Sequence, residues 1–324
     1  MGFLTRTVIV SAVFIAGFSA YAAGSPDPGL RMLETENYSA AQAYFQSMLR
    51  KDPRNAGTAA DMARLYLAQG QNQTGVQWAR KAVALAPDNA VFEMLLGDAY
   101  VQYVNDVGFF SKFGIAHRIL AAYQKAVQLD PDNADARYSL AMYYIMAPGL
   151  AGGSTVKGHA QIAALDKIAP TEAEQALAED ALERKHFKRG EALLQQAAQH
   201  SSGEGSAVAL ALLLAEHDHQ YVRAMRVLDQ AIRKDPHADL AYYELGHVAV
   251  LGKTHVPQGI AGLQKYLGLP HSWRPGTPPY KWAQYRLGML YGLDGDKSDE
   301  KAQYEAALKL DADFKQAKKA LASL

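Results

Sequence analysis

The 324-residue sequence predicts an all-α fold, a solenoid of about eight helical hairpins that ends in a C-terminal capping helix. Three observations predict it. Prolines follow apolar-rich stretches at regular intervals, a Leu-Gly pair recurs near the start of several stretches, and small or apolar residues recur three and four positions apart. Stacked repeats grow by adding units, so the usual prior of about 150 residues per domain does not apply.

Composition excludes several classes of protein. Hydrophobic residues make up 49% of the chain, which suits a folded protein with a large core. The 33 basic residues balance the 33 acidic ones, so no net charge attracts nucleic acid or an anionic membrane. The chain has no cysteine, which excludes disulfides, thiolate metal sites and a lipidated N-terminal cysteine. We therefore expect neither a nucleic-acid partner nor stable membrane insertion of the mature chain.

Residues 1–22 have the pattern of a secretory signal peptide. A positively charged start is followed by an apolar stretch over 7–19 and by the small-residue site Ala20-Tyr21-Ala22. An uncleaved anchor helix is the alternative, but this stretch is shorter than the ~20 residues that span a bilayer. We expect cleavage after Ala22 and a periplasmic or secreted protein. The lack of disulfides favours a bacterial periplasm.

The prolines set the repeat length. Proline ends a helix and disfavours helical geometry in the residue before it, so each one marks the end of a hairpin. The first and last intervals are 34 residues, one interval of 66 is close to two units, and those of 44 and 39 are one unit with an insertion. The expected unit ends are Pro53, Pro87, Pro131, Pro170, Ser202, Pro236, Pro270 and Asp311.

The residues within each unit resemble those of a known repeat. Leu96-Gly97 and Tyr100, and again Leu287-Gly288 and Tyr291, open a first helix, while Ala41 and Phe45 share one face of a second helix. This skeleton and the 34-residue period resemble the tetratricopeptide repeat family over 27–324. The resemblance implies a right-handed superhelical solenoid over 23–313 and a capping helix over 314–324.

Three inserts interrupt the period, near 104–114, 147–154 and 269–279. The second reads A-P-G-L-A-G-G-S, and this loop resembles that of a narrower group of bacterial exported repeat proteins. The first carries Phe109, Phe110 and Phe113, and three apolar rings so close together favour a packed position over water. We expect these rings to pack on the glycine-rich loop; the alternative is a protruding contact for a partner or a second copy.

No motif for catalysis, a cofactor or a metal emerges. The glycine-rich residues 149–154 and Lys157 lack the order of a phosphate-binding P-loop, so we expect Ser154 or Thr155 to cap the next helix. His217 and His219 are two residues apart, which would point them to different faces of a helix. The sequence predicts a protein that is not an enzyme and carries no metal or cofactor.

The resemblance implies that certain positions on each first helix line a concave groove. Their aromatic and methionine side chains suit a bound peptide or amphipathic helix. The alternative for each tyrosine is packing against the neighbouring hairpin. The predicted partner-binding residues are Arg64, Asp98, Gln102, Tyr138, Met142, Glu179, Tyr243, His247, Trp282, Tyr285 and Met289.

These features predict a non-enzymatic scaffold of the cell envelope that binds a protein or peptide segment. The alternative is a small-molecule-binding accessory subunit of a periplasmic transport system, with its ligand between the phenylalanine insert and the glycine-rich loop. The sequence does not decide between these ligands, name the partner or specify the oligomeric state.

Overall fold

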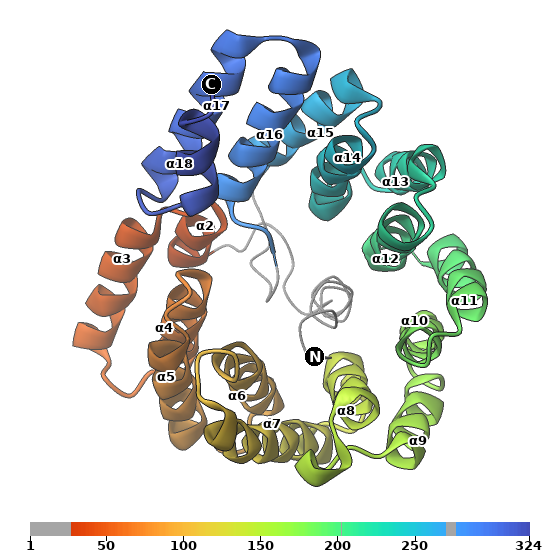
Figure 1. The fold of residues 1–324 in the computed structure, drawn as a ribbon. Helices are drawn as coiled ribbons and strands as arrows, with labels where there is room; N and C mark the ends of the chain where they lie inside the picture. Colours follow the sequence, from red (N-terminus) through yellow and green to blue (C-terminus); the bar gives the residue numbers. More distant parts are fainter. Residues whose placement is uncertain (1–26, 202, 270–276) are drawn as a thin grey trace. The chain divides into compact units, whose positions relative to one another are not determined.

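The computed structural model describes residues 27–201, 203–269 and 277–324, and in this part of the chain it contains helices and no strand. Consecutive helices pair into hairpins (Figure 1). The predicted class, an all-α repeat of helical hairpins, is confirmed. Within the described ranges, no helix is both long and apolar enough to cross a membrane. The predicted signal peptide, and all but a few residues of the insert at 269–279, lie outside these ranges.

The helices fall into two compact units. The N-terminal unit, 27–190, has its own apolar core, which includes Leu95, Tyr123 and Leu140. Its hairpins are α2 (Pro28–Glu34) with α3 (Tyr38–Lys51), α4 (Ala56–Ala68) with α5 (Asn72–Leu85), α6 (Ala90–Tyr103) with α7 (Phe109–Leu129), α8 (Ala134–Met146) with α9 (Thr155–Leu165), and α10 (Pro170–Glu183) with the start of α11 (Phe187–His200).

The C-terminal unit comprises 191–201, 203–269 and 277–324 and contains the rest of α11. Tyr243, Leu263, Tyr266 and Leu287 lie in its apolar core. Its helices are α12 (Gly205–Leu212), continued by a π-helical turn (Leu213–His217), with α13 (Tyr221–Lys234); α14 (Asp239–Gly252) with α15 (Val256–Gly268); α16 (Tyr280–Asp294) with α17 (Lys297–Leu310); and the final helix α18 (Lys315–Leu321).

Three hairpin boundaries in the N-terminal unit combine a proline with an asparagine. Pro53 and Pro131 follow the last turn of a second helix, and two residues later Asn55 and Asn133 begin the next first helix. Their side chains accept hydrogen bonds from backbone N–H groups that have no partner within the helix, Thr58 N at 2.8 Å and Ala136 N at 2.9 Å. Proline thus stops one helix and asparagine starts the next.

The fourth boundary differs from the expected one. Helix α9 already ends at Leu165, and Pro170 is the first residue of α10 rather than the close of its predecessor. Proline suits this first position because its missing N–H would have no helical partner there and its φ angle is already helical. Pro170 therefore marks the start of the fifth hairpin.

The glycine-rich insert forms a tight turn between α8 and α9. Gly152 has a φ of +91°, a conformation that side chains with a Cβ rarely adopt, and a Cβ at Gly153 would lie 1.8 Å from the carbonyl oxygen of Ala147. The Ser154 side chain then caps α9 by accepting a hydrogen bond from Lys157 N at 3.4 Å. The predicted capping role of Ser154 is confirmed.

The phenylalanine insert lengthens α7, and its rings do not pack on the glycine-rich loop. Phe109 and Phe110 are 64% and 88% exposed, so the expected packing is wrong. Helix α7 has 21 residues where its partner α6 has 14, and the three phenylalanines lie in its first five positions. The loop instead meets α7 further along, where the Tyr143 hydroxyl lies 2.7 Å from the carbonyl oxygens of both Ala116 and Ala151, to which its one proton can be donated.

The two helices of a hairpin approach most closely at a glycine of the first helix. In α6, a Cβ on Gly97 would lie 2.4 Å from the ring of Tyr123, which is completely buried in α7. The Leu-Gly pair in the sequence therefore marks the place where the second helix sets an aromatic ring against the backbone of the first. A side chain at this position would separate the helices.

We expect Gly97→Ala to lower the free energy of unfolding by about 1–3 kcal/mol, because the added methyl group meets a ring that cannot move. Gly114→Ala in α7 is the matched control, because nothing lies within 4 Å of its Cβ. Alanine there should stabilise the helix by up to about 1 kcal/mol. Urea denaturation followed by circular dichroism measures both changes; equal stability of the two variants would contradict the packing role of Gly97.

Candidate functional site

The predicted binding residues divide into two groups by exposure. All of them lie on first helices, as expected, but about half of their side chains are buried. The buried ones are Arg64, Asp98, Tyr138, Met142, Glu179 and Tyr243. The partly exposed ones are Gln102, His247, Trp282, Tyr285 and Met289.

Tyr138 of α8 and Glu179 of α10 form a buried polar pair. The tyrosine hydroxyl donates a hydrogen bond to Oε1 of Glu179, and the amide of Gln175 donates to the same oxygen at 3.1 Å. The other carboxylate oxygen of Glu179 is buried without a hydrogen-bond partner among the described residues. Burial raises the pKa of Glu179 to about 8, against the lowering effect of its two hydrogen bonds. The pair joins α8 to α10 through a carboxyl group that is neutral at pH 7.

Asp98 of α6 has a similar setting. It accepts a hydrogen bond from the Tyr123 hydroxyl at 2.8 Å, and burial raises its pKa to about 7. The tyrosine is the ring that packs on Gly97, so the aspartate holds that ring in place. Asp98 therefore belongs to the hairpin interior.

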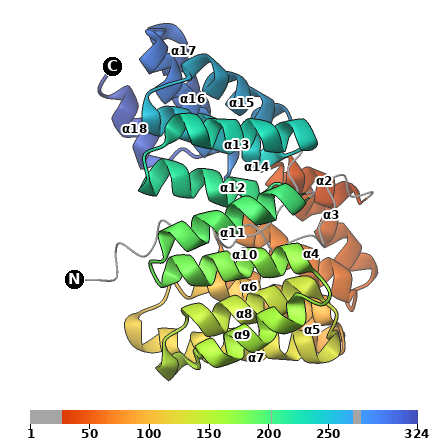
Figure 2. The same ribbon diagram turned by 90° about the vertical axis from the view of Figure 1, so that its right-hand side faces the viewer.

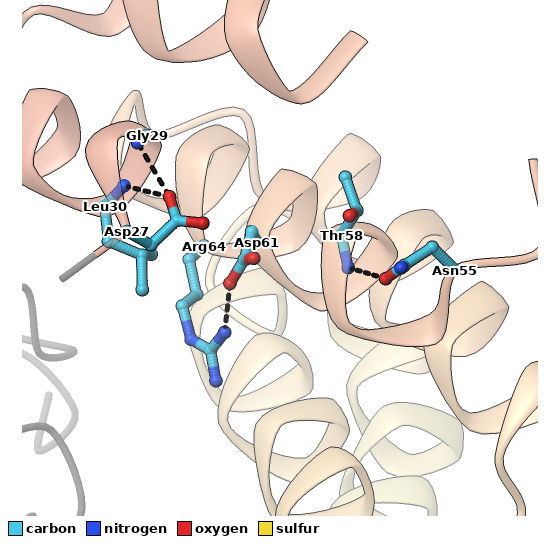
Figure 3. A network of polar contacts seen from close by, with 7 residues as sticks. All are labelled: Asp27, Gly29, Leu30, Asn55, Thr58, Asp61 and Arg64. Carbon is cyan, nitrogen blue, oxygen red and sulfur yellow. Dashed lines mark hydrogen bonds and ion pairs between the residues drawn. The ribbon is translucent and has the colours of Figure 1, made fainter. Parts of the chain in front are cut away.

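Arg64 lies near the start of the N-terminal unit, where charged groups of α2 and α4 meet (Figure 3). Its guanidinium donates to Asp61 Oδ1 at 2.6 Å. Asp27, the residue before α2, caps that helix by accepting from Gly29 N at 2.7 Å. Burial raises the pKa of Asp61, and the charge of Asp27 adds to this rise against the lowering effect of Arg64. The cap of α2 and the Arg64–Asp61 pair of α4 thus each lie within one helix and its cap.

Trp282 and Tyr285 of α16 hold the final helix. Phe314, the residue before α18, is buried with its ring centroid 4.7 Å from that of Trp282 and 5.6 Å from that of Tyr285. These two predicted binding residues therefore pack part of their apolar surface against the residue that precedes α18. Met289, one turn further along α16, is half-buried.

Four charged residues gather on neighbouring first helices of the C-terminal unit, and we call them the ionic cluster: Glu216, Glu244, His247 and Arg286. Glu216 lies in the π-helical turn after α12, Glu244 and His247 in α14, and Arg286 in α16. Helix α14 packs against both the π-helical turn and α16, which brings the four side chains together. A π-helical turn widens the helix locally and is frequent at functional sites.

The charges within the ionic cluster are partly matched. Nδ1 of His247 lies 2.7 Å from Oε2 of the buried Glu244. The guanidinium of Arg286 lies over the ring of Tyr243, 4.7 Å from its centroid. Among the described residues, none accepts a hydrogen bond from Arg286, although Glu216 is near enough for their charges to interact. The N–H donors of Arg286 are therefore available to an acceptor outside the described residues.

Burial and neighbouring charges shift the pKa values of the ionic cluster. Burial lowers the pKa of Arg286 to about 10 and raises that of Glu216. Burial also lowers the pKa of His247, but the charge and hydrogen bond of Glu244 outweigh this effect and raise it overall.

A cavity of about 430 Å³ lies beside this cluster. This volume is within the range of roughly 300–1,000 Å³ that ligand pockets occupy. His219, in the turn that leads to α13, has a φ of +55° and its ring lies 3.2 Å from the Tyr221 hydroxyl. The lining residues are Ala215, Glu216, His217, His219, Tyr221, His247 and Leu251.

The cavity is lined by side chains that can donate or accept hydrogen bonds. They include three histidines, a glutamate and a tyrosine. In the described part of the chain, no group of three or more His, Asp or Glu side chains is arranged to hold a metal ion. His217 and His219 are both exposed.

The sequence predicted part of this site and missed the rest. Tyr243 and His247 were expected on the groove wall, and the structure brings them together with Arg286. Glu216, Glu244 and Arg286 were not predicted, although each is a charge within an otherwise apolar stretch of a first helix. That contrast was the available signal, since a charge on the buried face of a helix needs a partner.

Comparisons with protein families agree with the repeat architecture. Models described as tetratricopeptide repeat match residues 32–99, 122–153 and 283–314. These matches support the resemblance drawn from the Leu-Gly and proline pattern. No match was found among curated proteins.

Solved structures with similar folds are distant in sequence. A thermophilic tetratricopeptide repeat protein of Thermus thermophilus is 20% identical, with 62% of this chain and 95% of that chain covered and a TM-score of 0.46. YrrB, described as having an unusual peptide-binding site, is 15% identical, with 76% and 98% covered and a TM-score of 0.38. PilF of Pseudomonas aeruginosa is 14% identical, with 70% and 97% covered and a TM-score of 0.43. Likeness at this level carries no conclusion about ligands.

We expect Glu179→Gln to remove a loss of stability that the native chain suffers as the pH rises. Burial raises the pKa of Glu179 from 4.5 to about 8 in the folded state. The protonated carboxyl group therefore contributes its full stabilisation of the fold below pH 4.5, and this stabilisation declines as the pH rises to about 8. The variant should therefore gain stability relative to the native chain across this range, by on the order of a few kcal/mol. Urea denaturation at a series of pH values measures the difference.

An exposed carboxylate provides the control for this experiment. Glu305→Gln on α17 removes the same charge from an exposed side chain and should leave the pH profile unchanged. Asp98→Asn should show the same behaviour as Glu179→Gln but reach its full effect by about pH 7, where the pKa of Asp98 lies. A flat difference between Glu179→Gln and the native chain would show that this carboxyl ionises freely.

Proposed function

We propose that this tetratricopeptide repeat chain is a non-enzymatic scaffold of the cell envelope that binds a segment of a partner protein on its first helices. The three family matches support the general role, because stacked helical hairpins offer extended surfaces to other proteins. The ionic cluster of the C-terminal unit is the binding site that we assign to this role. The chain acts by holding its partner and needs no cofactor.

The observation that carries the proposal is the state of Arg286. Its guanidinium lies on the Tyr243 ring, and no described residue accepts its hydrogen bonds. Its hydrogen-bond donors are therefore available to an acceptor on a ligand. A carboxylate fits the planar guanidinium best because it can accept two parallel hydrogen bonds. We therefore assign the partner segment a carboxylate, from a side chain or a chain terminus, which binds Arg286.

The cavity that Glu216 and His247 of the ionic cluster line suits a peptide more than a small solute. Leu251 is 41% exposed at the cavity, and Tyr221 and the histidines offer both apolar surface and hydrogen-bonding groups. The small-molecule alternative placed its ligand between the phenylalanine insert and the glycine-rich loop. Those rings stand exposed at the start of α7, so that arrangement gains no support.

We expect a peptide selected for binding to lose at least about ten-fold in affinity when Arg286 is changed to Gln, because a charge-assisted hydrogen bond contributes about 1.5–3 kcal/mol. An array of immobilised peptides supplies the ligand, and isothermal titration calorimetry measures the affinity. Binding should also weaken as the pH rises through the pKa of His247, because the imidazole then loses its positive charge.

Arg80→Gln is the matched control, since Arg80 is an exposed arginine on α5 of the other unit. Circular dichroism should show equal helicity for both variants. If the selected peptide binds Arg286→Gln and the native chain equally well, the ionic cluster is not the site. If the array yields no peptide while metabolites raise the melting temperature, the ligand is a small molecule and the proposal is wrong.

The envelope location rests on residues 1–22 and is also part of the proposal. The resemblance of the A-P-G-L-A-G-G-S loop to exported bacterial repeat proteins supports it. In a bacterial host, the chain should be recovered from the periplasmic fraction with Ala23 as its first residue. Replacing Ala20 and Ala22 with Glu should block this cleavage, because the site requires small residues. Recovery of the chain from the cytoplasm with its first residues intact would contradict export.

A further inference from the structure

A second surface of the C-terminal unit has no role in the proposal above. It is a groove on the second helices, between α11 and α13, with α12 beneath it, and its volume is about 550 Å³. These three helices lie side by side in both views (Figures 1 and 2). We propose that this groove, the basic groove, binds an acidic peptide segment of a partner protein.

Contacts from α13 to α11 limit the groove at each end. At one end Arg223 forms an ion pair with Glu191 at 2.5 Å. At the other, Lys234 donates hydrogen bonds to the carbonyl oxygens of Ala198 and Gln199 at 2.8 and 3.1 Å. The eleven steps along α13 from Arg223 to Lys234 span about 16 Å at 1.5 Å per residue. The two helices are thus tied together at the ends and separated between them.

Two arginines between these ends have no ion-pair partner among the described residues. Arg226 and Arg233 line the groove and are exposed, and neither forms an ion pair with any residue that the structure describes. The described residues that line the groove include four cations and no acidic side chain. Acidic residues equal basic ones over the whole chain, so this concentration of one sign is local. The charge of the groove is complementary to an anionic ligand.

The groove also has an apolar floor and amide side chains on its walls. Leu210 of α12 lies in the floor, and Ala198 and Val227 extend it on the two sides. Gln195 of α11 and Gln230 of α13 line the walls, and an amide both donates and accepts hydrogen bonds. A peptide matches this combination, because its backbone needs donors and acceptors while its side chains can be alternately acidic and small.

A polymer of phosphates matches the groove less well. Nucleic acid is drawn to a protein by a broad positive field, and this chain carries no net charge. The narrow row of arginines favours carboxylates that reach individual guanidinium groups. A planar guanidinium can bind one carboxylate with two parallel hydrogen bonds. The occupant that fits is therefore a short acidic stretch of protein with small residues between its carboxylates.

The probe is a fluorescein-labelled peptide of alternating Glu and Ala, measured by fluorescence polarisation with the full chain. We expect it to bind, to bind more weakly as salt is raised, and to be replaced poorly by the matching peptide of Gln and Ala. The double variant R226Q/R233Q should weaken binding about ten-fold. The variant R226K/R233K keeps both charges but loses the planar fork, so its affinity should lie between those of R226Q/R233Q and the native chain.

The control K309Q/K315Q removes two charges from exposed lysines of the same unit and should bind the peptide as the native chain does. Native affinity in R226Q/R233Q would overturn the proposal. Tighter binding of an oligothymidylate than of the peptide would also overturn it, as would self-association that R226Q/R233Q abolishes, because the occupant would then be nucleic acid or a second copy. Loss of peptide binding in Arg286→Gln alone would place the peptide on the ionic cluster instead.

Discussion

The close contact between the two helices of a hairpin is the constraint on which the rest of this structure depends. A glycine in the first helix lets a ring or a leucine of the second helix reach its backbone, as at Gly97 with Tyr123 and at Gly246 with Leu263. One hairpin cannot bury its apolar face alone, so this contact also sets the surface that the next hairpin covers. At three boundaries of the N-terminal unit, a proline ends one helix and an asparagine starts the next.

Polar side chains on the first helices are paired in two different ways where the helices pack together. In the N-terminal unit, Asp98 and Glu179 are held as hydrogen-bonded carboxyl groups whose pKa values burial has raised. In the C-terminal unit, acidic groups meet cations, as Glu244 meets His247. The first solution joins neighbouring helices. The second leaves Arg286 with hydrogen-bond donors that no described residue uses, which is the property expected of a binding site.

The C-terminal unit therefore offers two chemically distinct surfaces. The ionic cluster lies on first helices beside a cavity with histidine and tyrosine side chains. The basic groove lies between second helices, and its described lining carries charge of one sign only. A scaffold built from one repeated unit gains such separate sites because each helix layer exposes its own residues, while the same hairpin packing supports both.

The sequence by itself determined the helical class, most of the hairpin boundaries and the cap at Ser154, because these depend on local properties: proline stops, asparagine and serine caps, and apolar residues three and four positions apart. It also placed the predicted binding residues on first helices. Only the tertiary structure decided which of them face the interior. Tyr138 and Glu179 are 41 positions apart and meet because α8 packs against α10. The exposure of Phe109 likewise follows from how far α7 extends beyond α6, and the basic groove from the separation of α11 and α13. Such relations depend on distances between helices, which the residues of one helix do not encode.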